Sequence, residues 1–153
     1  MSLKRLLKSF KYAFSGILHT IQTEQNMRIH LSAASFVIAF AYFFGISKPE
    51  WALLFVVIGF VFFAELLNTA IERLADACIK EYDINIKYAK DAAAGGVVAA
   101  VFAAVAAGIV IFGDIGRILS TVFYILNNFV PLAVFICLAV INILFLLKAG
   151  KTD

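Results

Sequence analysis

Charged residues are scarce in this chain, and that scarcity sets its class. Asp, Glu, Lys and Arg make up 15% of its 153 residues, hydrophobic residues make up 63%, and the mean hydropathy is +0.98. Soluble globular domains contain about 45–50% apolar residues. The composition therefore predicts an integral membrane protein. At about 20 residues per span, the length allows three or four transmembrane helices and no separate soluble domain.

Other absences exclude several classes of function. A net charge of +3 gives no indication of a nucleic-acid partner. The two cysteines, Cys78 and Cys137, fit neither a disulfide framework nor a CxxC metal pair. His19 and His30 have no His or Cys at ligand spacing, which disfavours a transition-metal site. Lysines interrupt any N-terminal hydrophobic region, so no cleavable signal is expected.

Residues 3–24 are expected to form an amphipathic helix that lies on the membrane surface. Leucine, isoleucine and phenylalanine recur there at helical spacing, and Lys4, Lys8 and Lys11 occupy the opposite face. The lysines are available to anionic headgroups, so the helix could serve as an anchor.

Four apolar segments are long enough to span a bilayer. We expect an all-α membrane fold with spans at about 29–47, 51–71, 92–112 and 129–147. A tight polar turn, Ser47-Lys48-Pro49-Glu50, is predicted between the first two spans. Residues 72–91 are polar: their first half is predicted to extend the second span as a helix, and Tyr82–Lys87 to form a loop.

The positions of lysine and arginine predict the orientation. With a cytoplasmic N-terminus, only Lys48 and Arg117 lie outside. The positive residues inside are then Lys4, Arg5, Lys8, Lys11, Arg28, Arg73, Lys80, Lys87, Lys90, Lys148 and Lys151. The same orientation places the acidic residues of interest at or near the cytoplasmic face of the membrane.

Glu65, Asn68, Glu72 and Asp76 form the most unusual pattern in the sequence. Their spacing of i, i+3, i+7 and i+11 aligns them along one helical face, which begins inside an apolar segment. Such groups are costly in hydrocarbon and must face another helix, another subunit or water. Two interpretations remain open: a hydrogen-bond network that joins helices, or a functional site.

As a functional site, the stripe suits phosphoryl transfer to a membrane alcohol. Glu65 lies at the depth expected of a base that takes a proton from an alcohol whose tail stays in the bilayer. Glu72, about 10 Å nearer the cytosol by helical rise, suits Mg²⁺, with Glu24 as a second carboxylate. Lys90 adds a cation for phosphate oxygens, beside Asp91. No GxxxxGK[ST], HRD or DFG motif is present, so the residues alone leave a kinase as one option.

The string AELLNTAIERLADACIKEYDINIKYAKDAAAG (64–95) strongly resembles the signature of the small bacterial diacylglycerol kinase and undecaprenol kinase family. TEQNMRIHL (23–31) matches as well, and the resemblance covers about residues 4–112. It implies a homotrimer of three-span subunits, each with an N-terminal surface helix, whose active sites are shared between neighbours. It also implies ATP as the phosphoryl donor and a membrane lipid alcohol as the acceptor.

The resemblance assigns roles to individual residues. It makes Glu65 the general base with Asn68 beside it, and makes Glu24 and Glu72 the carboxylates that hold Mg²⁺. The residues implied to contact nucleotide are Arg5, Tyr12, Lys90 and Asp91, and those in supporting roles are Arg28 and Asp76.

Two features depart from the family pattern. Residues 1–112 correspond to the family domain, whereas 113–153 add an extension with the fourth span, which we expect to be peripheral packing rather than chemistry. Asn142 within that span either bonds across helices or is idle. His30, in the form RIH, is typical of the branch that often prefers undecaprenol, so diacylglycerol and undecaprenol both remain candidate substrates. The rival hypothesis is a non-enzymatic channel or assembly partner that uses the acidic stripe for helix association.

Overall fold

The chain is almost entirely helical. The computed structural model describes residues 2–78 and 81–148, and the regular structure in these residues consists of six helices. They are α1 (Leu3–Thr23), α2 (Gln25–Phe44), α3 (Lys48–Cys78), α4 (Ile84–Phe112), α5 (Ile115–Asn127) and α6 (Phe129–Leu147). Four of them, α2, α3, α4 and α6, are long and apolar enough to cross a membrane. The predicted all-α membrane fold with four spans is thus confirmed, although Lys80 and Lys151 lie outside the described residues.

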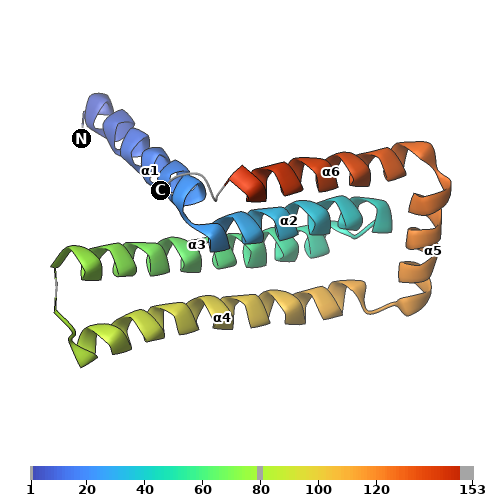
Figure 1. Cartoon of the computed structure of the whole chain (residues 1–153). Coiled ribbons are helices and arrows are strands. Elements are labelled where there is room, and N and C mark those ends of the chain that lie inside the picture. The colour runs from blue at the N-terminus through green and yellow to red at the C-terminus, as the bar shows by residue number, and fades with distance from the viewer. Residues whose placement is uncertain (1, 79–80, 149–153) are drawn as a thin grey trace.

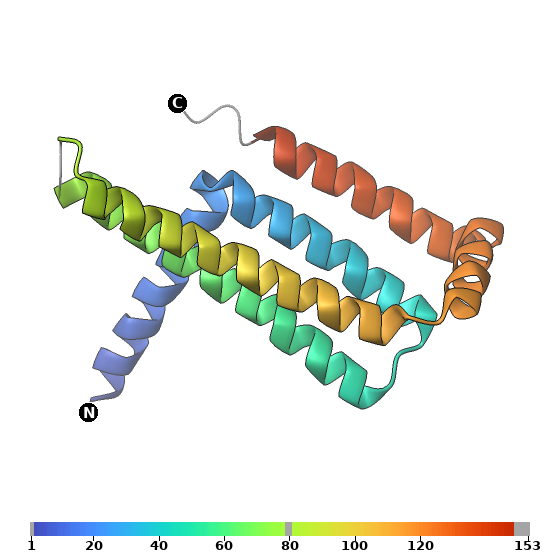
Figure 2. The same ribbon diagram turned by 90° about the horizontal axis from the view of Figure 1, so that it is seen from below.

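The four long helices run side by side (Figures 1 and 2). α3 packs along α4, and α6 packs against α2 on the side away from α4. The helix α5 crosses one end of the bundle and joins α4 to α6, whereas α1 projects from the opposite end. We call these the α5 end and the α1 end. The bundle begins with α2 and ends with α6. The first residues of α2 and the last residues of α6 both lie at the α1 end.

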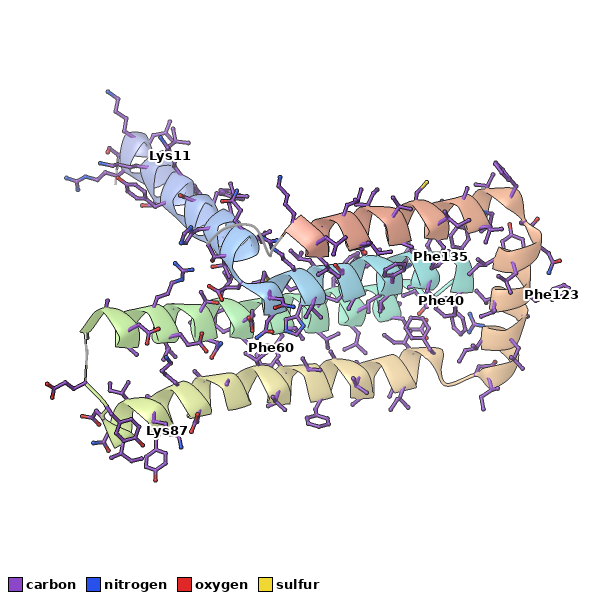
Figure 3. All side chains as sticks on the ribbon, in the orientation of Figure 1. Lys11, Phe40, Phe60, Lys87, Phe123 and Phe135 are labelled. Atoms are coloured by element: carbon purple, nitrogen blue, oxygen red, sulfur yellow. The ribbon has the colours of Figure 1, made fainter. Side chains whose placement is uncertain are left out.

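A buried apolar cluster lies at the α5 end. It consists of Ala41, Phe44, Ile46, Leu54 and Ile111. The Phe44 and Phe112 rings meet edge to face with their centroids 5.2 Å apart, and Figure 3 shows Phe40 beside them. Elsewhere large apolar side chains face outward, as expected where lipid rather than water surrounds the helices.

The turn between α2 and α3 is earlier than predicted. Gly45 adopts φ +74°, a left-handed conformation that glycine tolerates at a helix C-terminus. Lys48 and Glu50, predicted as turn residues, belong to the first turn of α3. The Glu50 carboxylate accepts a hydrogen bond from the Ser47 backbone N–H at 2.6 Å, which satisfies a donor that the helix leaves unpaired.

The connection from α3 to α4 is also shorter than predicted. Residues 84–87, taken as part of a loop, are the first turn of α4. The Asp83 carboxylate accepts from the Asn85 backbone N–H at 2.7 Å and caps the helix. The loop prediction for residues 84–87 was wrong because they alternate between apolar and polar side chains, which is not the apolar spacing of a helix.

The helix α5 was not predicted. Asp114 caps it by accepting from the Arg117 backbone N–H at 3.0 Å. The Arg117 side chain donates to the Phe44 carbonyl at 2.9 Å and lies 4.3 Å from the centre of the Phe44 ring. Gly113 precedes α5 where a side chain could not fit, since a Cβ there would lie 2.8 Å from the Ile109 carbonyl oxygen.

The fourth span, α6, has the predicted bounds of 129–147. Asn142 is buried, and its side-chain amide donates to the Ser35 hydroxyl of α2 at 3.0 Å. Of the two roles considered for Asn142, bonding across helices is therefore confirmed. Phe135, labelled in Figure 3, stacks on Phe36 of α2 with ring centroids 6.4 Å apart, so aromatic packing and polar bonds together hold α6 against α2.

Candidate functional site

The acidic stripe lies on α3, inside the bundle. Glu65 is 2% exposed and Asn68 is 5% exposed, so both side chains are shielded by protein. Glu65 lies about 26 Å along the helix axis from Lys48 and about 20 Å from Cys78, well within the length of the span. The Asn68 amide donates to the Glu72 carboxylate at 3.1 Å. One helical face therefore carries a continuous polar path from the interior toward the α1 end.

Several buried polar atoms along this path have no hydrogen-bond partner. Among the described residues, they are Glu65 Oε2, Asn68 Oδ1, Thr69 Oγ1 and, on α2, Ser32 Oγ. A buried acceptor or hydroxyl without a partner costs about 1–3 kcal/mol, and native structures contain few of them. Three of the four belong to one stretch of α3, residues 65–69. This stretch is therefore not a fully satisfied hydrogen-bond network of the kind that only joins helices.

Glu24 reaches the same region from a different element. It lies between α1 and α2 in an extended conformation, with φ −97° and ψ 120°, which ends the predicted helix 3–24 one residue early. Its carboxylate accepts from Arg73 of α3 at 2.8 Å and from the adjacent Thr23 hydroxyl at 3.1 Å. The junction of α1 and α2 is thereby attached to the residue that follows Glu72.

Arg73 is a functional candidate that sequence reasoning missed. Its guanidinium also donates to His19 Nε2 at 2.6 Å and to the Thr23 hydroxyl at 2.7 Å. The sequence holds a weak indication of this cluster, because His19 and Thr23 are one helical turn apart and Arg73 is adjacent to Glu72. Arg73 contributed only to the prediction of orientation, since the sequence could not show which face of α3 meets α1.

The donor set fits a hard divalent cation in part. Glu24 reaches α3 through Arg73, the residue that follows Glu72, so two of the predicted carboxylates approach the same part of the helix. In the described part of the chain, however, no three His, Cys, Asp or Glu side chains come close enough to hold a metal ion by themselves. Mg²⁺ typically takes only one or two protein carboxylates and completes its shell with waters and substrate phosphates. The carboxylates of Glu24 and Glu72 match that requirement.

Lys90 and Asp76 join α3 to α4 near the α1 end. Lys90 Nζ lies 2.8 Å from Asp76 Oδ1, and both side chains remain partly open to the surroundings. An ion pair at such a position contributes about 0–1 kcal/mol to stability. Lys90 is therefore free to exchange Asp76 for another anion at little cost. Asp91, the next residue, is exposed.

The remaining nucleotide candidates lie on α1, apart from this pair. Arg5 and Tyr12 are exposed, and Lys8 Nζ lies 5.7 Å from the centre of the Tyr12 ring. In Figure 3, Lys11 of α1 and Lys87 of α4 lie on opposite sides of α3. The single chain thus brings Glu24 to Arg73, the neighbour of Glu72, and Lys90 to Asp76. The helix α1, which carries Arg5 and Tyr12, and the helix α4, which carries Lys90, lie on opposite sides of α3 (Figure 1).

A wide apolar space lies next to the polar stripe. It has a volume of about 300 Å³ and lies between α2, α3 and α4, where Val61 and Phe62 of α3 line it together with His30 and Ala34 of α2. Val61, which lines the space, precedes Glu65 by one helical turn on the same face of α3.

Comparison with known proteins gives matches over most of the chain. The profile of the family described as prokaryotic diacylglycerol kinase matches residues 11–112. An undecaprenol kinase from Bacillus subtilis is 42% identical over 112 residues, which cover 72% of this chain and 89% of that protein. A diacylglycerol kinase from Synechocystis is 38% identical over 104 residues, which cover 67% of this chain and 59% of that protein. No solved structure matches the chain.

Proposed function

Because the chain belongs to the prokaryotic diacylglycerol kinase family and is a lipid kinase, we propose that it transfers the γ-phosphoryl group of ATP to diacylglycerol or undecaprenol. The products would be phosphatidate or undecaprenyl phosphate, in phospholipid or cell-envelope lipid metabolism. The observation that carries this proposal is the buried Glu65, whose Oε2 has no partner and which lies one helical turn from Val61 in the wall of the apolar space between α2, α3 and α4. The rival hypothesis of a non-enzymatic channel or assembly partner is not favoured by the two kinase relatives.

In the proposed reaction, Glu65 is the general base. The lipid tail occupies the hydrocarbon region while its hydroxyl reaches Glu65, which takes the proton as the hydroxyl oxygen bonds to the γ-phosphorus. The bond from that phosphorus to the bridging oxygen breaks and ADP leaves. Asn68 holds the Glu72 carboxylate through its side-chain amide, one helical turn from Glu65. Mg²⁺ held by Glu24 and Glu72 would neutralise charge on the phosphate oxygens.

Nucleotide binding is assigned to Lys90 and Asp91 of α4 and to Arg5 and Tyr12 of α1. Lys90 would exchange its contact with Asp76 for phosphate oxygens, and Arg28 and Asp76 are supporting residues. Because α1 and α4 lie on opposite sides of α3 in one chain (Figure 1), neighbouring subunits would complete each site, in the homotrimer that the family resemblance implies. Residues 1–112 would form the kinase domain and 113–153 an extension, in agreement with the end of the family match at residue 112.

The site is proposed to face the cytoplasm of a bacterial inner membrane, and two native cysteines test this. Cys78 is exposed at the α1 end, whereas Cys137 is exposed in the middle of α6, where lipid would cover it. A membrane-impermeant maleimide is expected to label Cys78 in inside-out vesicles and neither cysteine in right-side-out vesicles. The Cys78→Ser variant identifies the labelled site. Labelling of Cys78 in right-side-out vesicles would reverse the proposed orientation.

The lipid acceptor is tested by direct competition. Purified protein in lipid nanodiscs receives labelled ATP with diacylglycerol and undecaprenol present in equal amounts. Transfer to either lipid supports the proposed function, and the ratio of kcat/KM values identifies the preferred acceptor. Absence of label in both lipids, with Mg²⁺ supplied, would contradict the proposal.

A further inference from the structure

One buried arginine connects the C-terminal ends of two helices. Arg28 is 5% exposed, and its Nε donates to the Ile21 carbonyl at 2.8 Å while its Nη2 donates to the Gln22 carbonyl. Both carbonyls belong to the last turn of α1. Its Nη1 donates to the Phe145 carbonyl of α6 at 3.4 Å, and the guanidinium carbon lies 5.5 Å from the centre of the Phe145 ring.

This arrangement suits a guanidinium for two reasons. The last four carbonyls of a helix have no partners within it, and they carry the negative end of the helix dipole. The five N–H donors of Arg28 satisfy such carbonyls from α1 and α6 together. Within the described residues, Arg28 has no carboxylate partner. The two helix ends and the ring face of Phe145 are therefore what compensates its buried charge.

The same junction carries the candidate metal ligand Glu24. Gln22, whose carbonyl accepts from Arg28, is two residues before Glu24, and the Glu24 carboxylate is in turn bonded to Arg73 on α3. A continuous set of contacts thus runs from α6 through Arg28 and the end of α1 to the acidic region of α3. The helix α6 lies outside residues 11–112, so its part in this set of contacts falls outside the family match.

We propose that α6 positions the acidic site, with Phe145 acting through Arg28 on the junction that holds Glu24. In this proposal α6 does more than the peripheral packing expected from the sequence. The inference rests on the proposed metal role of Glu24. Phe145 touches neither substrate nor metal and is a positioning residue.

The test uses three substitutions on α6 in the full chain. Phe145→Leu keeps apolar volume but removes the ring face from Arg28, whereas Phe145→Tyr retains the ring. Phe135→Leu is the matched control: it removes a ring that packs on Phe36 and Phe43 of α2, away from Arg28. Binding of Mn²⁺ with a non-hydrolysable ATP analogue is measured by electron paramagnetic resonance. Hydrogen exchange is measured over residues 20–26.

Phe145→Leu is expected to weaken Mn²⁺ binding about threefold to tenfold and to speed exchange at the junction of α1 and α2. Phe145→Tyr and Phe135→Leu should each change both quantities less than twofold. Equal effects of Phe145→Leu and Phe135→Leu would show that α6 acts only through general packing, which would overturn the inference. It would also be overturned if Phe145→Leu changed neither Mn²⁺ binding nor hydrogen exchange. Both readouts are independent of turnover, so a lack of phosphoryl transfer in the unmodified chain would contradict the proposed function alone.

Discussion

Glu65→Gln is expected to abolish phosphoryl transfer while the chain remains folded and inserted in the membrane. A positioned general base contributes about 10²–10⁴-fold to rate, and the amide cannot accept the proton of the lipid hydroxyl. Glutamine has nearly the shape of glutamate and carries no charge, so burial at 2% exposure favours it over the native residue. The loss of activity should therefore accompany unchanged or increased thermal stability, a combination that a purely structural role would not produce.

The measurement is single-turnover transfer from labelled ATP, together with a thermal unfolding curve in detergent. Glu50→Gln is the matched control, because Glu50 lies on the same helix at the opposite end of the bundle and keeps a carbonyl for the Ser47 N–H. It should retain the native rate. Near-normal turnover by Glu65→Gln would remove Glu65 from the mechanism.

The second large effect is expected from Glu72→Gln. The substitution removes a negative charge but preserves a side-chain oxygen that can accept from the Asn68 amide, now 3.1 Å from Glu72. Losing one interaction at a metal site typically costs about 10–100-fold in affinity, even when the group is not a direct ligand. The Mg²⁺ concentration for half-maximal activity should therefore rise at least about tenfold, with a smaller change in KM for the lipid.

A Mg²⁺ titration of the lipid kinase activity decides this. Glu81→Gln serves as the control, since it removes the same charge from an exposed position just before α4. It corrects for the general loss of negative potential at the α1 end. Superimposable titrations for Glu72→Gln and the native chain would exclude Glu72 as a ligand.

Much of the fold is predictable because the membrane simplifies the pattern. The bounds of α6 follow directly from an uncharged segment that begins after Asn128 and ends at Lys148. The helix α5 is less predictable, because Gly113, Asp114 and Gly116 suggest a loop, and its stability depends on contacts with α2 and α6 that only the folded chain provides. Boundaries set by a single cap, such as Asp83 before α4, are similarly local and easily missed.

In the candidate site, too, relations within one helix are predictable from the sequence, whereas contacts between helices are not. Spacing on one helix correctly indicates that Asn68 and Glu72 share a face, and they are hydrogen-bonded. The contacts of Glu24 with Arg73 and of Arg28 with Phe145 join residues that are far apart in the chain. No periodicity encodes such pairs, because they depend on how α1 and α6 approach the bundle. The roles of the site residues stay predictions until the substitutions above are measured.

The placement of α6 determines which surface of the bundle remains open to the membrane. Because α6 lies beyond α2, on the side away from α4, the outer surface of α4 stays uncovered, with Phe102 70% and Val110 77% exposed. Lipids that approach α4 therefore meet a surface to which α6 does not contribute (Figures 1 and 2). The helix α6 therefore changes the surface of the molecule beside α2 and leaves the surface of α4 unchanged.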